Sequence, residues 1–207
     1  RIVSVSACGS LIEEFAPGHI VIPDQLYDNT RLRPRSFFGE GLVAHASVAD
    51  PFCGDLSTQV ESAAREAGGV VHKGGAFITI EGPRFSTRAE SNTFRAWGMS
   101  IIGMTASPEA FLAREAEICY ATMAHVTDYD VWHVSEEPVT VEMVIQTLHR
   151  NTSLAQEAIR IIAREFTGAR NCDCKNALST ALITRKDAIP AETLKKLDLL
   201  VHKYLKE

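Results

Sequence analysis

Two acidic residues follow an apolar run and are the strongest candidates for chemistry in this chain. Asp128 and Asp130 come just after residues 118–126, a run that we predict to be a strand. One residue separates them, so on extended backbone both side chains point the same way. Such a pair can hydrogen-bond to, or protonate, a nitrogen-rich ligand. The alternative is a surface turn, but an acid that leaves a buried strand is costly unless it is paired.

A neighbouring strand end and a loop supply possible walls for such a ligand. Met104 and Thr105 end a predicted strand. Residues 81–87 place Phe85 and Ser86 just before a predicted helix, an arrangement that can stack a flat ring and offer it a hydroxyl. In an open α/β sheet, ligands bind beyond the carboxyl ends of the strands, where these residues fall. Packing alone is the alternative for both apolar side chains.

The motifs of several common nucleotide and hydrolase sites are absent. The sequence has no G-x-x-x-x-G-K-[ST], no strand-borne G-x-G-x-x-G and no G-x-S-x-G, which excludes the corresponding folds. Neither His45 nor the other histidines have metal-ligand spacing, and Cys172-x-Cys174 has no second cysteine pair, so we expect no zinc and no other metal. Cys53 and Cys119 stand in apolar contexts typical of buried thiols, and a disulfide within the C-x-C stays open.

The elements that must position these residues alternate between strands and helices. We predict strands over residues 2–6, 19–24, 76–80, 100–104 and 118–126, and helices over residues 55–68, 88–97, 108–117, 139–166 and 190–205. Residues 29–41 form a long ordered loop, a kind that is usually functional or interfacial. The alternation predicts an α/β layer structure. We expect one domain over residues 1–207, with residues 169–207 as a tail and helix docked on it.

Composition and charge narrow the class of protein. The 207 residues are 45% hydrophobic and 23% charged, which is ordinary for a globular domain. The net charge of −5 argues against a nucleic-acid surface, because there is no basic stripe to neutralise phosphates. No apolar run approaches the ~20 residues that span a bilayer. We therefore expect a cytoplasmic protein with no membrane contact.

These motifs occur together, in this order, in a known family. The segments are SACGSL (6–11), EGPRFSTRAES (81–91), GMT (103–105), PE (108–109) and TDYD (127–130). In them the chain resembles the 5′-methylthioadenosine phosphorylases, which belong to the trimeric purine nucleoside phosphorylases. The resemblance implies a phosphorylase/hydrolase-like three-layer fold with a mixed central sheet flanked by helices. It also implies a homotrimer or homohexamer, with phosphate as co-substrate and no cofactor.

The implied reaction gives the candidate residues their roles. Phosphate displaces adenine from methylthioadenosine and yields 5-methylthioribose 1-phosphate, a step of purine and methionine salvage. By resemblance, Asp128 acts on purine N7 as a protonated acid and Asp130 accepts from the exocyclic amine. A buried carboxyl beside another has a raised pKa, which suits an acid at neutral pH. The remaining implied contacts are Phe85 on the purine, Met104 and Cys8 at the nucleoside, and Ser6, Ala7 and Thr105 on phosphate.

Three positions favour a 6-amino purine with an apolar 5′ group. Members that act on 6-oxopurines resemble this chain but carry Asn in place of Asp128, Glu in place of Ser86, and His in place of Val141. A carboxyl pair suits a 6-amino group, and Val144, one helical turn after Val141, would widen an apolar pocket for a methylthio group. His45, by resemblance, reaches the site from an adjacent subunit.

Family members carry about 80 residues before the point that corresponds to Arg1, more than a third of a small domain. They include a Gly-Gly-Ser-Gly phosphate loop and an Arg-His pair that this sequence lacks, so we expect it to be N-terminally incomplete. Three alternatives therefore stay open. They are a broader purine nucleoside phosphorylase acting on adenosine or inosine, a nucleosidase that uses water, and a purine-binding assembly subunit without catalytic activity.

Overall fold

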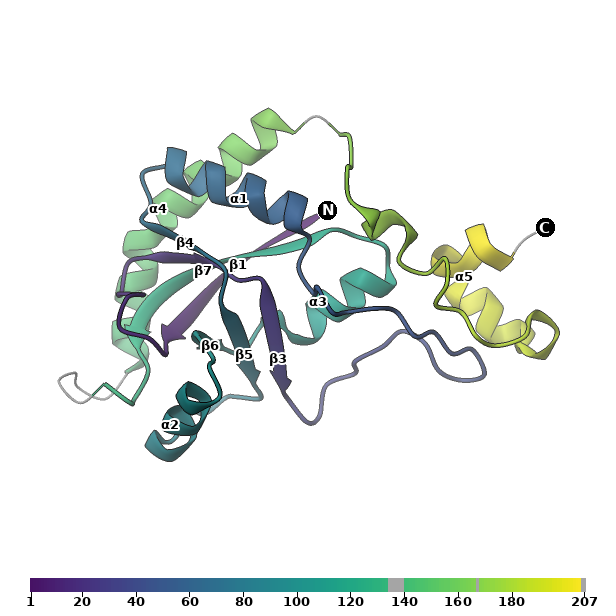
Figure 1. Cartoon of the computed structure of the whole chain (residues 1–207), viewed down its shortest axis with the longest axis horizontal. Helices are drawn as coiled ribbons and strands as arrows, with labels where there is room; N and C mark the ends of the chain where they lie inside the picture. The colour runs from purple at the N-terminus through teal and green to yellow at the C-terminus, as the bar shows by residue number, and fades with distance from the viewer. Residues whose placement is uncertain (134–139, 167, 206–207) are drawn as a thin grey trace.

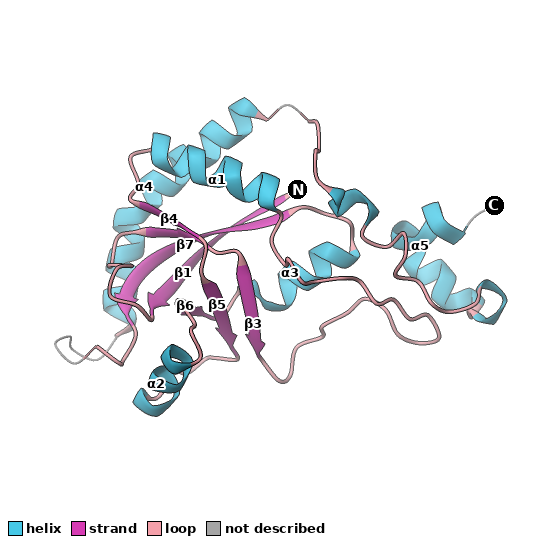
Figure 2. Ribbon diagram, viewed as in Figure 1, coloured by secondary structure: helices cyan, strands magenta, loops and turns pink. Residues whose placement is uncertain are grey.

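A seven-stranded mixed sheet forms the centre of this computed structural model, which describes residues 1–133, 140–166 and 168–205 (Figure 2). The strand order is β3–β5–β6–β1–β7–β2–β4. The strands are β1 (Ile2–Ser10), β2 (Ile20–Ile22), β3 (Gln25–Asn29), β4 (Val71–Lys73), β5 (Ala76–Ile80), β6 (Ile101–Gly103) and β7 (Tyr120–Tyr129). The central pair, β1 and β7, is parallel, whereas β6 is antiparallel to β1 and β2 is antiparallel to β7.

Helices cover the two faces of the sheet and complete a three-layer arrangement (Figure 1). The helices are α1 (Gly54–Glu66), α2 (Arg88–Ala96), α3 (Ala106–Glu115), α4 (Val141–Glu165) and α5 (Ala191–Leu205). Helices α1 and α4 pack together on one face and α3 lies against the other. The predicted α/β fold with a mixed, helix-flanked sheet is confirmed.

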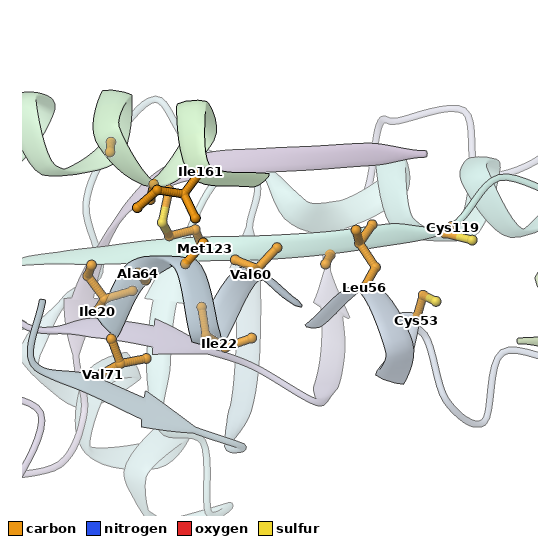
Figure 3. Close-up of a cluster of buried hydrophobic side chains, with 14 of the residues drawn as sticks. Ile20, Ile22, Cys53, Leu56, Val60, Ala64, Val71, Cys119, Met123 and Ile161 are labelled. Carbon is orange, nitrogen blue, oxygen red and sulfur yellow. The ribbon is translucent and has the colours of Figure 1, made fainter. Parts of the chain in front are cut away.

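Strand β7 is the axis of the core because both of its faces are buried. Met123 belongs to the layer under α1 and α4, where it meets Val60 and Ile161 (Figure 3). Its neighbour Ala124 faces the opposite way and packs with Phe77 in the layer under α3. The sequence of β7 is therefore largely apolar, as expected for a strand that is covered on both faces.

Two strands run further than the sequence predicts, and both extensions reach the candidate site. The first strand continues past Ser6 to Ser10, and β7 continues past Val126 to Tyr129. The two are paired along this whole length, with a bulge after Cys8. Small and acidic residues stay extended here because ladder hydrogen bonds to a partner strand outweigh their preference for turns.

Strands β3 and β4 were not predicted. Residues 25–29 are polar and β4 has three residues, so neither shows the alternation that identifies a strand. They form because β3 pairs with β5 and β4 pairs with β2. The other predicted elements are present with ends shifted by a few residues, and Val139, the predicted start of α4, lies outside the described residues.

Helix α5 lies apart from the sheet, beside the long loop of residues 29–41 (Figure 1). Leu42 is fully buried against Ile189, Leu197 and Val201. Thr193 Oγ1 donates a 2.6 Å hydrogen bond to the Glu40 carbonyl. Among the described residues, no helix combines the length and apolar character needed to cross a membrane.

Candidate active site

A pocket of about 250 Å³ opens beside the last residues of β1, β5, β6 and β7. It is lined by Ala7, Cys8, Gly9, Ile80, Phe85, Ser86, Ile102, Gly103, Met104, Thr105, Thr127, Asp128, Asp130 and Val144. Nine of the twelve predicted site residues are therefore brought together from five separate parts of the sequence. Ser6 lies directly behind the lining, and Val141 and His45 lie elsewhere.

Asp128 sits on β7 where the neighbouring strand leaves room for its carboxyl group. A Cβ atom at Gly9, its partner in β1, would lie 3.1 Å from Asp128 Oδ2, so a larger residue there would crowd the carboxyl group. Thr127 Oγ1 donates a 2.5 Å hydrogen bond to Asp128 Oδ1. Burial raises the pKa of Asp128, the hydrogen bond from Thr127 lowers it, and the negative charge of Asp130 raises it. The net result is a pKa of about 7. The group is thus poised to carry a proton near neutral pH.

Asp130 is held by the loop that precedes α2. Ser86 Oγ lies 2.8 and 2.7 Å from the two carboxylate oxygens of Asp130 and donates to them. Asp130 and Ser86 are both buried, at 6% and 8% exposure, and the Asp130 backbone N–H donates to the Ser10 carbonyl at 2.9 Å. The two acids therefore differ in their surroundings, because a serine hydroxyl holds the Asp130 carboxyl group whereas Asp128 is buried with a raised pKa.

The loop before α2 presents the ring of Phe85 to the pocket. Thr87 and Glu90 form a capping box at the start of α2, and Arg84 pairs with Glu90 at 2.7 Å. These bonds fix the backbone on both sides of Phe85. Its ring is 40% exposed and lines the pocket, so one face is open to a flat ligand.

Two hydroxyl groups meet at another corner of the pocket. Ser6 Oγ and Thr105 Oγ1 are 2.7 Å apart, although the two residues come from β1 and from the end of β6. Ala7 follows Ser6 and exposes its backbone to the same corner. Hydroxyls and backbone groups in this arrangement can hydrogen-bond to a small oxyanion. The sequence prediction grouped these three residues, and the structure brings them together.

Arg33 is a positioning residue that the sequence analysis missed. Its guanidinium donates to the carbonyls of Met104 at 2.7 Å, Ser107 at 2.6 Å and Glu81 at 2.9 Å. Gly82 supports the same junction, because at its φ of +69° a side chain would also strike Met104 Sδ. Arg33 thereby ties the long loop to the ends of β5 and β6. The only sequence feature that could have indicated this role is that Arg33 lies in a loop rich in proline and arginine.

Two predicted site residues lie outside this pocket. Val141, the first residue of α4, is 57% exposed, whereas Val144 reaches the pocket one turn later. His45 is exposed, and its backbone N–H donates to the Ala181 carbonyl of the tail at 2.8 Å. His45 therefore does not line the pocket of its own chain.

The sequence shows no second cysteine pair near Cys172-x-Cys174, but the folded chain places one beside it. Cys53 and Cys119, far from Cys172-x-Cys174 in sequence, lie within 4.8 Å of both tail cysteines at their sulfur atoms. All five cysteines are free thiols, and the prediction that Cys53 and Cys119 are buried is confirmed. Sequence spacing missed this cluster because three separate segments supply it.

Comparisons with known proteins agree with this geometry. The phosphorylase superfamily matches residues 1–164, and the chain belongs to this superfamily. Within it, the chain is similar to S-methyl-5′-thioadenosine phosphorylases. The protein of that name from Geobacter sulfurreducens is 54% identical over 99% of this chain and 72% of its own length. That from Koribacter versatilis is 50% identical over 100% of this chain and 71% of its own.

Solved structures show the same relationship. A methylthioadenosine phosphorylase from an antarctic soil metagenomic library superposes with a TM-score of 0.86 at 45% identity, over 96% of this chain and 71% of its own. The Schistosoma mansoni methylthioadenosine phosphorylase in complex with adenine superposes with a TM-score of 0.81 at 33% identity, over 88% of this chain and 72% of its own. The fold predicted from the resemblance is confirmed.

Proposed function

We propose that this chain is a phosphorylase that splits S-methyl-5′-thioadenosine with inorganic phosphate, giving adenine and 5-methylthioribose 1-phosphate. One observation carries the assignment. A protonatable acid, Asp128, and a fixed acceptor, Asp130, line one pocket together with the open ring of Phe85. An acid, an acceptor and an aromatic face are the groups needed to bind adenine and to help it leave.

The acid pair makes the base a better leaving group. As the bond between the ribose and the base breaks, its electron pair moves onto the purine and the ribosyl centre becomes cation-like. Protonated Asp128 donates to N7 and neutralises this charge, as a general acid whose pKa lies near the working pH. Asp130, held by Ser86, accepts from the exocyclic amine and orients the ring. Phe85 stacks on the purine.

Phosphate attacks the ribosyl carbon from the hydroxyl corner. We assign Ser6, Ala7 and Thr105 to phosphate binding, supported by the 2.7 Å approach of the Ser6 and Thr105 hydroxyls. Phosphate is a co-substrate here, and no catalytic cofactor is needed, because both the acid and the nucleophile are already supplied.

The walls of the pocket favour an apolar 5′ group on the ribose. Met104 and Val144 line it, and Cys8 contributes a thiol whose pKa is raised by burial and by Asp128, so this thiol stays neutral. We assign Met104 and Cys8 to the nucleoside and Val144, with Val141 at the start of the same helix, to the methylthio group. An apolar lining of this kind favours methylthioadenosine over nucleosides with a 5′-hydroxyl.

The test is adenine release from methylthioadenosine by the full chain, measured with and without inorganic phosphate. We expect release to require phosphate and to be accompanied by methylthioribose 1-phosphate. Equal rates in both conditions would refute phosphorolysis and favour a nucleosidase. Adenine binding without any release would instead favour a binding subunit. Parallel reactions with adenosine and inosine measure the breadth of the substrate specificity, and we expect both nucleosides to react more slowly than methylthioadenosine.

We further propose that residues 1–207 act as one catalytic domain on which residues 169–207 dock as a tail. The docking is visible at Glu117, whose carboxylate accepts from the Leu178 backbone at 3.1 Å and from Lys203 Nζ at 2.7 Å. We propose a homotrimer or homohexamer, since the exposed His45 can then complete a neighbouring site. A cytoplasmic role in purine and methionine salvage fits free thiols, which are typical of a reducing compartment.

A further inference from the structure

Four of the five cysteines converge at the end of β7 opposite to the pocket. Cys119 immediately precedes β7, Cys53 immediately precedes α1, and Cys172 and Cys174 come from the tail after α4. Their four sulfur atoms all lie within 4.8 Å of one another. Figure 3 shows Cys53 and Cys119 together at one end of the buried layer under α1 and α4.

Backbone contacts hold the segments that carry these sulfurs. The Cys53 N–H donates to the Tyr120 carbonyl at 2.8 Å, which places the start of α1 beside the start of β7. The Ile2 N–H donates to the Cys119 carbonyl at 2.8 Å. These bonds join both segments to the central strands β1 and β7, so Cys53 and Cys119 form a rigid half of the cluster.

The environment of the sulfurs is dry. Cys53, Cys119 and Cys174 are 3%, 1% and 4% exposed, and Cys172 is partly buried against the same apolar cluster. The sulfurs of Cys119 and Cys172 are 3.4 Å apart. In a tetrahedral zinc site the Zn–S bonds of about 2.3 Å place the sulfurs about 3.8 Å from one another. The cluster is therefore within about 1 Å of the geometry that zinc requires.

We propose that Cys53, Cys119, Cys172 and Cys174 bind one Zn²⁺ ion as a closed, structural four-thiolate site. Four protein ligands leave no open position for a substrate, which separates a structural zinc site from a catalytic one. The ten residues of β7, at about 3.3 Å each, also put the cluster roughly 30 Å from the acid pair. The metal fastens the tail to the start of α1 and β7.

The charges around the cluster suit a metal–thiolate centre. Four thiolates and Zn²⁺ carry a net charge of about −2, and Arg114 of α3 places its Nη1 3.6 Å from Cys174 Sγ. The same guanidinium donates to the Asp50 carbonyl, which anchors it there.

The direct test is the zinc content of the full chain, purified without chelators and under a reducing agent. We expect about one zinc per chain. Titration of the metal-free, reduced chain with Zn²⁺ against a chromophoric chelator should give a Kd of about 10 nM or tighter, as four-thiolate sites do. Substitution by Co²⁺ should give the intense thiolate charge-transfer bands of a tetrahedral sulfur site.

Matched variants separate ligation from folding. The Cys172→Ser, Cys174→Ser pair removes two ligands from the tail and should abolish zinc binding while leaving the core sheet intact by circular dichroism. Cys174→His keeps a zinc ligand and should restore binding in part. Cys8→Ser removes the fifth cysteine, which lies at the pocket, and should leave zinc content unchanged.

Three results would overturn the proposal. The first is a reduced chain with no zinc in which all five thiols react freely with a thiol reagent. The second is an affinity weaker than about 10 nM, or one unchanged by the loss of both tail cysteines. The third is a chain purified anaerobically, with zinc supplied, in which the four cysteines are joined in disulfide bonds.

Discussion

At the scale of single residues, the proposed reaction depends on two acids of the same kind that have different surroundings. Asp130 accepts a hydrogen bond from the single hydroxyl proton of Ser86, whose Oγ lies close to both carboxylate oxygens. Asp128 receives a hydrogen bond from Thr127, faces the charge of Asp130 and is mostly buried, so its pKa rises to about 7. The surroundings of each carboxyl group, and not the residue type, therefore decide which one we propose as the acid and which as the acceptor.

Replacement of the acid tests this division. We expect Asp128→Asn to lower kcat for methylthioadenosine by about 10² to 10⁴, the usual contribution of a general acid. In the unmodified chain kcat should fall as pH rises through about 7, because Asp128 then loses its proton. In the variant this decline should disappear. Asp187→Asn, on the exposed tail, is the matched control. An unchanged pH profile in the Asp128 variant would contradict the assignment.

The same pKa shift affects stability with a definite sign. The folded-state pKa of Asp128 is raised from 3.8 to about 7, so the folded state binds its proton more tightly than the unfolded state does. The associated stability is present below pH ~4 and is lost as pH rises to about 7, at roughly 1.4 kcal/mol per pKa unit. Asp128→Asn should therefore be no less stable than the unmodified chain at pH 8 by thermal unfolding, although its kcat is strongly lowered. A lower Tm would mean that lost activity reflects unfolding.

At the scale of elements, the pocket depends on a loop that contributes no lining residue. Residues 29–41 carry Arg33, whose guanidinium caps the ends of β5 and β6 from outside. Without it, the carbonyls of Met104 and Glu81 would lose a charged donor at the point where the pocket wall turns. Loop and strand ends therefore act as one unit.

Removal of this guanidinium should loosen the pocket. We expect Arg33→Met to lower the free energy of unfolding by about 3 kcal/mol, because several partly buried carbonyls lose a charged donor. It should also raise KM for methylthioadenosine more than it lowers kcat, since Arg33 does not touch the reacting atoms. Steady-state kinetics and urea unfolding measure the two effects. Arg31→Met, at an exposed position of the same loop, should change neither, and an equal effect there would refute a specific role for Arg33.

At the scale of the whole molecule, the proposed role of His45 makes activity depend on assembly. His45 lies on the segment that pairs with the tail through Ala44 and Leu182. It is exposed and does not line the pocket of its own chain. If it serves a neighbouring site, then no single chain holds a complete site. This consequence can be tested without a structure of the assembly.

Mixed assemblies provide that test. Asp128→Asn chains keep His45 but lack the acid, and His45→Ala chains keep the acid but lack the histidine. When the two are unfolded together and refolded, some sites combine the intact acid of one chain with the intact histidine of another. We expect activity above that of either variant alone, with a mass by light scattering of about three or six chains. Activity equal to the average of the separate variants would place His45 outside the neighbouring site.

The sequence by itself determined the class of fold and indicated most of the residues that line the pocket. Local signals sufficed for Asp128 and Asp130, which share one face because side chains alternate along a strand. The motifs around Phe85 and Thr105 were equally local, and the structure places both at the predicted pocket. The strand and helix alternation also predicted the layers correctly, since hydrophobic periodicity reports which face of an element is buried.

Only the tertiary structure decided what depends on distant partners. Strands β3 and β4 exist because of pairing, and Arg33 gains its role from carbonyls that lie about 50 to 70 residues away. The bond from Ser86 to Asp130, which holds the acceptor in place, likewise joins positions 44 residues apart. The cysteine cluster joins three segments that no sequence spacing connects. Each of these features is fixed by non-local contacts, which a reading of neighbouring residues does not contain.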